Sequence, residues 1–281
     1  MSPQMSARLE NVLCAIDSWP VPTVAAAVVG SDGVIAARGP IEHEFALASV
    51  TKPLAVLAML VAVEEEAIDL AQPADEALIP GATVRHLLAH ASGLAPERPL
   101  RSFAPAVRRV YSNVGIELAA SITEAAVGMP FASYFDEGLV RPLGLARTCL
   151  PGSPARDGIS TVGDLSVVVQ RILSPGGFLH PSTLAEATAV QYPGLRGVLP
   201  GFGPQDPNDW GLGFEIRGAK SPHWTGPANS RATFGHFGQS GTMFWIDPAV
   251  GVGVIALTDR GFDAWARSAW PALAAAVLAA L

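Results

Sequence analysis

The chain has 281 residues, of which 49% are hydrophobic and 15% charged, so it can bury a sizeable core and is not intrinsically disordered. Its formal net charge is −7, and it has no run rich in lysine and arginine. This charge gives the protein no electrostatic means of binding nucleic acid or an anionic membrane, and we expect neither as a partner.

The two cysteines, Cys14 and Cys149, are too few for a disulfide framework and too far apart for a cysteine metal site. We expect two free thiols packed as small hydrophobes. Residues 1–19 lack the basic stretch followed by an apolar run that marks a signal peptide. The most apolar segments, 53–63 and 272–281, are too short to span a bilayer. The sequence therefore predicts a soluble, cytoplasmic protein.

The first part of the chain alternates between helix and strand patterns. Apolar spacing over 10–17 predicts a short amphipathic helix. Two β-rich runs, 23–29 and 34–37, are separated by a Gly-Ser-Asp-Gly turn and read as a hairpin. A long helix is predicted over 53–68, with Thr51 where an N-cap belongs.

The middle of the chain, from about residue 70 to 192, reads as helical and irregular, and after Trp210 the pattern changes to strands. Helices are predicted at 83–91, 114–127, 131–139, 161–173 and 262–281, and strands at 212–216, 233–237, 241–246 and 252–258. Strands at both ends of the chain most simply share one sheet. We expect an α/β (α+β) fold with an antiparallel sheet flanked by N- and C-terminal helices, plus a mostly helical lobe.

A single domain covers 1–281 in this interpretation. The sheet subdomain takes about 1–75 and 205–281, and the helical subdomain takes about 76–204. A cleft between two such parts is a common place for a ligand site.

Ser49-Val50-Thr51-Lys52 places a serine and a lysine three residues apart at the start of the predicted helix. This spacing puts the hydroxyl and the amine on one helical face, within reach of each other. A serine hydroxyl is a poor nucleophile until a base takes its proton, and a buried lysine can do so or can hold a neighbouring phenolate. The helix N-terminus adds positive potential near a developing oxyanion.

Two further short motifs lie at element boundaries. Tyr111-Ser112-Asn113 directly precedes a helix, and His236-Phe237-Gly238 lies on a predicted strand between further glycines. Each motif means little alone, but the three occur in this order on suitable elements.

In this order the motifs resemble the serine β-lactamase family, which includes class C β-lactamases, DD-peptidases and related esterases. The likeness extends from about Val21 onward. It includes the segments Phe45–Pro53, Val84–Leu94 (similar to a Leu-Leu-x-His-x-Ser-Gly-Leu signature), Arg141–Leu145, Trp210–Phe214 and Leu257–Arg260. The resemblance implies a β-lactamase/transpeptidase-like fold and a serine hydrolase that forms an acyl-enzyme without a cofactor or a metal.

The resemblance also implies roles for single residues. Ser49 is the expected nucleophile, and Lys52 and Tyr111 share the proton transfers, with the choice of general base left open. The expected substrate-binding residues are Asn113 on the acyl side, His236 where many β-lactamases have the Lys of Lys-Thr-Gly, Gly238 and Gln239. Backbone N–H groups of Ser49 and Gln239 are expected to form the oxyanion hole.

Two departures from the family pattern bear on the substrate. His236 and Phe237 replace Lys and Thr, which weakens binding of a β-lactam carboxylate, and the stretch 94–111 is short. We expect a small-molecule ester, amide or β-lactam substrate, with small esters or amides favoured. The alternatives are a β-lactamase, a D-amino-peptide hydrolase, or a catalytically silent binding module. An intact Ser49, Lys52 and Tyr111 set favours an enzyme.

Other readings of the reactive residues are weaker. His86 and His90 have the i, i+4 spacing of zinc ligands, but no Glu or third ligand accompanies them, so no metal site is predicted. Ser92 and Ser240 are candidate rival nucleophiles, but neither lies in a Gly-x-Ser-x-Gly elbow. The tryptophans are expected to fill the core and the cleft wall.

Overall fold

The computed structural model describes residues 3–174 and 176–281. Its centre is a six-stranded antiparallel sheet in the order β2-β1-β10-β9-β8-β7. These strands are β1 (Val24–Gly30), β2 (Gly33–Arg38), β7 (Glu215–Ile216), β8 (Phe234–Gly238), β9 (Thr242–Asp247) and β10 (Val252–Thr258). The predicted antiparallel sheet, built from both ends of the chain, is therefore confirmed.

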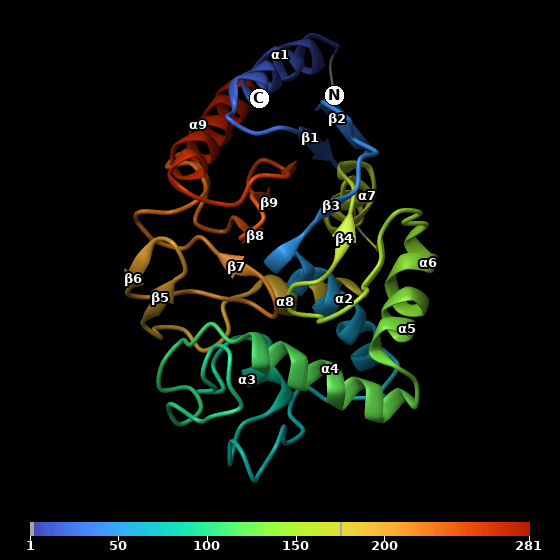
Figure 1. The fold of residues 1–281 in the computed structure, drawn as a ribbon, viewed down its shortest axis with the longest axis vertical. Helices are drawn as coiled ribbons and strands as arrows, with labels where there is room; N and C mark the ends of the chain where they lie inside the picture. Colours follow the sequence, from blue (N-terminus) through green and yellow to red (C-terminus); the bar gives the residue numbers. More distant parts are fainter. Residues whose placement is uncertain (1–2, 175) are drawn as a thin grey trace.

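Both faces of the sheet are covered, because alternate residues of each strand are buried in different cores. Ala25 and Ala27 of β1 contribute to one core, and Ala26 and Val28 contribute to the other. Helices α1 (Pro3–Leu13) and α9 (Ala264–Ala280) cover the second face; they lie side by side, with both termini at that end (Figure 1). Helices α2 (Thr51–Glu64) and α7 (Val162–Leu173) contribute to the first core.

Helix α2 is the buried axis of the molecule. Every residue from Thr51 to Leu60 is buried, which is why the segment lacks an amphipathic pattern. The helix begins at Thr51, two residues before the predicted start, after a short 3-10 turn at Ala48–Val50. The N-cap prediction for Thr51 was wrong, because its Oγ1 accepts a hydrogen bond from the N–H of Gly158 instead (2.9 Å).

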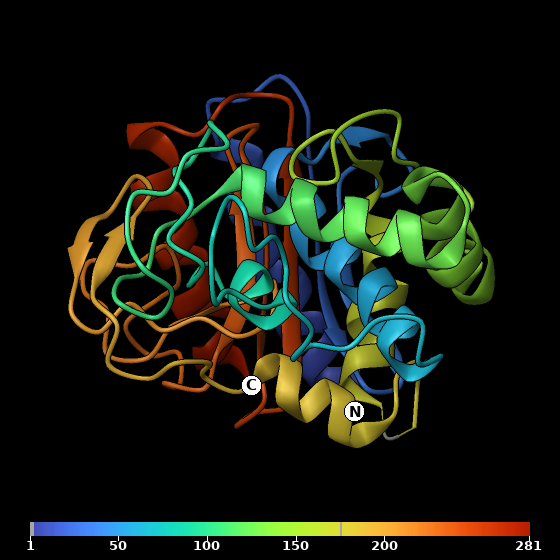
Figure 2. The ribbon, with the colours of Figure 1, turned by 90° about the horizontal axis from the view of Figure 1, so that it is seen from below.

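The helical part contains α3 (Val84–Leu88), α4 (Asn113–Val127), α5 (Phe131–Phe135), a π-helical turn (Asp136–Val140) and α6 (Arg141–Leu143). Helix α4 packs on α2 and α3. Figure 2, which shows the molecule from below, has α4 running across the front of it. Sequence patterns missed α8 (Pro181–Thr188) and the small sheets β3 (Phe45–Ala46) with β4 (Ile159–Ser160) and β5 (Gly197–Leu199) with β6 (Gly203–Gln205).

Some boundaries and environments differ from expectation. The predicted strand 212–216 shrinks to β7, and helix 83–91 shrinks to α3. Cys14 and Cys149 are free thiols, but both are exposed, so packing as buried hydrophobes was wrong. The division into sheet and helical subdomains stays a proposal; α7, placed by sequence in the helical part, packs on β1 and β10.

Among residues 3–174 and 176–281, no single helix is long and apolar enough to cross a membrane. One bent pair, Asn113–Val127 with Phe131–Leu143, meets the length and composition criteria only when joined.

Candidate active site

Ser49 lies in a turn that is fixed from two sides. The Leu47 N–H donates to the Gly158 carbonyl (2.8 Å), and the Thr242 hydroxyl of β9 donates to the Leu47 carbonyl (2.7 Å). Ala48 adopts a φ of 47°, a left-handed conformation that costs a non-glycine residue about 1–2 kcal/mol. Strain at the residue before a reactive group is tolerated only where the surrounding structure holds it, as it does here.

Lys52 follows one helical turn later, and its side chain is fully buried. Its Nζ donates to the Ser49 Oγ (3.1 Å) and to the Ala155 carbonyl (2.7 Å). The same Nζ lies 4.6 Å from the centre of the Tyr111 ring. The predicted i, i+3 contact between hydroxyl and amine is therefore present.

Tyr111 comes from the loop before α4 and reaches the same serine, donating from its hydroxyl to the Ser49 Oγ (2.7 Å). His90 holds this loop: its carbonyl accepts from the Val110 N–H and its Nδ1 accepts from the Ser112 N–H (3.0 and 3.2 Å). The Ser112 side chain caps α4 by accepting from the Gly115 N–H (3.1 Å). Residues 62 positions apart in sequence thus meet at one oxygen.

Burial sets the protonation of this pair. Desolvation, helped by the Arg156 charge, lowers the pKa of Lys52 to about 7. Desolvation raises the pKa of Tyr111 well above its ordinary value, although the Ser49 hydrogen bond opposes the rise. With its pKa lowered into the neutral range, Lys52 is available as a neutral amine near pH 7, whereas Tyr111 is a protonated phenol.

Strand β8 borders the nucleophile turn. Gly238 allows this approach, because a Cβ there would lie 2.3 Å from the Leu47 carbonyl oxygen. Gln239 follows, and its main chain and side chain are tied to Phe262 by hydrogen bonds of 2.8 and 3.1 Å. Gly238 thus lies against the nucleophile turn, and Gln239 borders the same cavity as Ser49.

His236 of β8 is buried and neutral. Its Nδ1 donates to the Phe237 carbonyl (2.7 Å), and desolvation, with the nearby Lys52 charge, lowers its pKa to about 3. The ring lies near those of Tyr111 and Trp210. Phe237 packs mainly against aromatic rings of the core beneath α9, including Trp270 and Phe262, so most of its surface is unavailable to a substrate.

Asn113, at the start of α4, has a partner that sequence patterns did not find. Its Nδ2 donates to the Glu97 Oε1 (2.5 Å), and its Oδ1 is buried without a partner among the described residues. Glu97 lies in the loop 94–111, where no motif pointed to it. Only the folded loop brings this carboxylate to the site.

A cavity of about 220 Å³ opens at Ser49. Six of its lining residues were singled out from the sequence: Ser49, Tyr111, Trp210, His236, Phe237 and Gln239. Four others were missed by sequence patterns: Glu97, Leu199, Pro200 and Glu215. Leu199 and Pro200 come from the β5–β6 hairpin. Lys52 and Asn113 lie behind this wall rather than on it.

Glu215 is a buried carboxylate at the cavity wall. It pairs with Lys220 and also accepts from the Trp224 Nε1–H (3.0 Å), and His223 Nε2 lies 2.9 Å away. Burial alone would raise the pKa of Glu215, but His223 and Lys220 lower it to about 2. This ionised cluster ties the 217–225 loop to β7.

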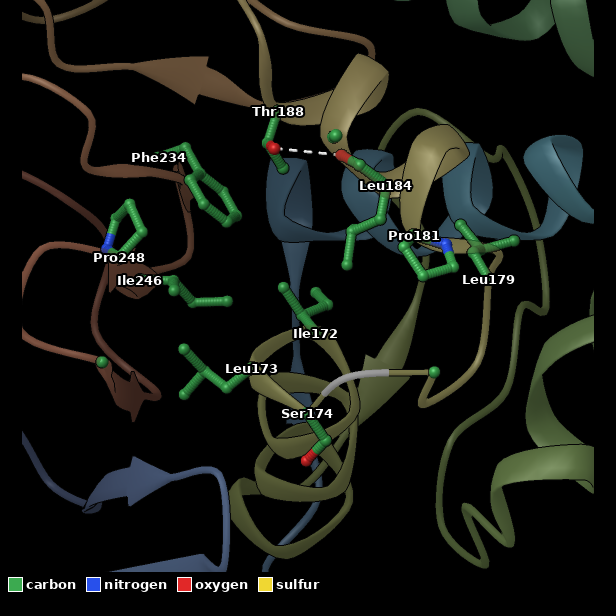
Figure 3. A pocket seen from close by; sticks show the side chains of 13 residues that line it. Ile172, Leu173, Ser174, Leu179, Pro181, Leu184, Thr188, Phe234, Ile246 and Pro248 are labelled. Carbon is green, nitrogen blue, oxygen red and sulfur yellow. Dashed lines mark hydrogen bonds between the residues drawn. The ribbon is translucent and has the colours of Figure 1, made fainter.

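A second cavity of about 380 Å³ lies between α7, α8 and the ends of β8 and β9 (Figure 3). Apolar side chains such as Leu173, Leu184 and Phe234 line it, and its Thr188 hydroxyl is already bonded to the Leu184 carbonyl (3.0 Å). Among the described residues that line it, no base lies beside a nucleophile, as an acyl-transfer site requires.

The other reactive residues have structural surroundings. His86 Nδ1 bonds to Thr83 at the start of α3, and His90 supports the Tyr111 loop. Among residues 3–174 and 176–281, no group of three or more His, Cys, Asp or Glu side chains could hold a metal ion. Ser92 is buried, and the Ser240 hydroxyl lies 3.2 Å from that of Thr242.

An antiparallel sheet, a buried central helix and a Ser-x-x-Lys turn between them are the features of a serine hydrolase with the fold of β-lactamases and penicillin-binding proteins. The Beta-lactamase family model matches residues 17–279, and the chain belongs to that family. The expected fold and the enzyme class are thereby confirmed.

Known relatives of the chain span several named activities. Its sequence is 49% identical to that of a β-lactamase from Mycobacterium bovis with a known crystal structure. The two structures agree with a TM-score of 0.92, and the match covers 95% of this chain and 98% of that one. A hydrolase with promiscuous acyltransferase activity, EstCE1, shares the fold at 18% identity and a TM-score of 0.78, with 98% of each chain covered. An N-acetylmuramyl-L-alanine amidase from Bacillus subtilis is 25% identical over 204 residues, which are 54% of this chain and 44% of that protein. The chain thus spans about half the length of the curated relatives it matches.

Proposed function

We propose that this protein hydrolyses small esters whose alcohol portion carries no charge, through an acyl-enzyme on Ser49 with Lys52 as the general base. The observation that carries the proposal is the arrangement around the Ser49 Oγ. This atom lies 3.1 Å from the Lys52 Nζ and 2.7 Å from the Tyr111 hydroxyl, at the wall of a cavity.

The two pKa shifts assign different roles to the two neighbours. A neutral Lys52 amine can accept the Ser49 proton as the Oγ attacks the ester carbonyl. Tyr111, which is a protonated phenol at rest, donates a hydrogen bond to that oxygen. In the proposal its hydroxyl gives a proton to the leaving alcohol and takes one from the Lys52 ammonium, so that the phenol and the neutral amine are both restored. The same amine then activates the water that hydrolyses the acyl-enzyme.

The oxyanion formed in each step needs donors that are already in place. The backbone N–H groups of Ser49 and Gln239 fill this role in the proposal, because Gly238 lets the two segments approach. The hydrogen bonds from Thr242 to Leu47 and between Gln239 and Phe262 keep both segments fixed.

The preference for an uncharged alcohol portion over a β-lactam carboxylate rests on the wall formed by β8. A β-lactam brings a carboxylate that needs a cation or hydroxyl donors. Here His236 is neutral, its Nδ1–H is used by the Phe237 carbonyl, and Phe237 offers no hydroxyl. A carboxylate left without donors at this position loses its hydration without compensation, whereas an ester alcohol does not.

The test is a panel of p-nitrophenyl esters and a chromogenic cephalosporin on the purified protein, with Ser49→Ala as control. We expect ester hydrolysis at a higher kcat/KM than any β-lactam, and we expect Ser49→Ala to abolish it. A phosphonate probe should leave its adduct on the Ser49 peptide. An adduct on Ser92 or Ser240, or a cephalosporin preferred over every ester, contradicts the proposal.

The variant that probes the substrate preference is His236→Lys. Exchanging Phe237 for Thr as well, the family pattern, would remove a ring from the core and cost about 3–5 kcal/mol. The single exchange should therefore move the kcat/KM ratio toward β-lactams with less damage to the fold.

A further inference from the structure

Two buried hydrogen-bond acceptors beside the cavity have no donor among the described residues. Asn113 must turn its Nδ2 toward Glu97, because a carboxylate only accepts, and this leaves the buried Oδ1 without a partner among the described residues. His236 must carry its proton on Nδ1, because that atom faces a carbonyl, so the buried Nε2 is a bare lone pair.

The charged groups around Arg156, the ion-pair partner of Glu97, are negative on balance. Glu97 Oε2 lies 3.3 Å from Arg156, which also lies 3.4 Å from Glu117, and the Asp157 charge acts on the same guanidinium. One arginine thus faces three carboxylates. The Glu97 side chain is 57% exposed and borders the cavity together with Ser49 and Tyr111.

Glu97 is also close enough for its charge to act on the reacting groups. Its carboxylate contributes to raising the pKa values of both Lys52 and Tyr111, against the larger effects of burial. Glu215, the other carboxylate on the wall, is already paired with Lys220. Glu97 is therefore the wall carboxylate with charge to spare for a substrate.

We propose that Glu97 is a specificity-determining residue that selects acyl groups bearing an ammonium, so that the preferred substrates are esters or amides of amino-bearing acids. This inference rests on the proposed Ser49 chemistry and narrows its substrate class. The ammonium supplies the countercharge to Glu97, which borders the cavity while its partner Asn113 does not. An ammonium that donates to a Glu97 oxygen forms a charge-assisted hydrogen bond, which is about twice as strong as a neutral one.

The experiment compares two p-nitrophenyl esters of nearly equal shape, the β-alanine ester and the butyrate ester, which differ by an ammonium in place of a methyl group. The quantity measured is the ratio of their kcat/KM values in the wild type divided by the same ratio in Glu97→Gln. Intrinsic differences in ester reactivity cancel in this double ratio. Glutamine removes the charge while its Oε1 can still accept from Asn113.

We expect the preference for the cationic ester to fall about tenfold in Glu97→Gln, as for the loss of a charge-assisted hydrogen bond. The matched control is Glu117→Gln, which removes a carboxylate from the same arginine but not from the cavity wall. Its ratio should change less than about twofold, as for a screened surface charge.

An unchanged ratio in Glu97→Gln, or an equal fall in Glu117→Gln, overturns the assignment to Glu97. The Ser49→Ala variant separates this result from the parent proposal. Butyrate hydrolysis that survives Ser49→Ala refutes the Ser49 mechanism itself. Butyrate hydrolysis that needs Ser49 but shows no Glu97 effect refutes only the ammonium selectivity.

Discussion

The titration of Lys52 is the most direct test of the mechanism. Its side chain has no exposed surface, and burial lowers its pKa from 10.5 to about 7. That change favours the neutral amine by about 5 kcal/mol, since one pKa unit is about 1.4 kcal/mol. A solvated lysine would be neutral in about one molecule in 3,000 at pH 7, so burial raises the fraction of usable base about a thousandfold.

The measurement is kcat/KM for an uncharged ester between pH 5 and 10. Only the neutral amine accepts a proton, so kcat/KM should rise about tenfold per pH unit below pH 6 and level off above pH 8. Product is followed at a wavelength where nitrophenol and nitrophenolate absorb equally. Tyr111, with its pKa raised, and His236, with its pKa near 3, do not titrate in this window.

The control is Lys52→Arg, which keeps a positive charge but cannot lose its proton at these pH values. We expect its kcat/KM to fall about a hundredfold or more, as for removal of general-base assistance, and to lose the rise with pH near pH 7. Two results would refute Lys52 as the base. One is a wild-type kcat/KM that does not rise between pH 5 and 9, and the other is the same rise in the residual activity of Lys52→Arg.

Three further outcomes follow from the geometry. Lys52→Ala and Tyr111→Phe should each lose about a hundredfold or more in turnover. The double variant should lose little more than the worse single variant, because the two side chains act on one hydroxyl. Additive losses in steady-state kinetics would show that the two side chains act separately. Gly238→Ala places a Cβ 2.3 Å from a carbonyl of the nucleophile turn, so turnover should fall about a hundredfold while circular dichroism stays native; full activity would exclude this close approach. Glu215→Gln leaves Lys220 buried without its counter-ion, and urea unfolding should show a loss of about 3–5 kcal/mol; an unchanged midpoint would show that the pair contributes nothing.

Sequence patterns predicted the large elements well where the physical signal is local. The Gly-Ser-Asp-Gly turn and the β-rich runs beside it identified the first hairpin, and the run 252–258 identified β10 with its observed bounds. Short elements were missed because they depend on partners distant in sequence. Strand β3 consists of two residues that become a strand only through pairing with β4, more than 110 positions later.

The site was predictable to the extent that it is built from motifs. The Ser-x-x-Lys spacing gave the contact between Ser49 and Lys52 directly, because an i, i+3 pair on one helical face needs no other information. The meeting of Tyr111 with Ser49 was inferred from family resemblance and is seen in the structure. Glu97 carried no signal at all, since a single carboxylate in a loop gains meaning only from what it lies against.

The sequence by itself determined the chemical inventory: a serine and a lysine on one helical face, a tyrosine and an asparagine before another helix, and a histidine where the family pattern has a cation. Tertiary structure decided the state of those groups. Lysine becomes a base only because α2 is buried on all sides, and His236 becomes a bare acceptor only because its other nitrogen faces a carbonyl. Desolvation and hydrogen-bond direction depend on every neighbouring element at once, and no local stretch of sequence contains them.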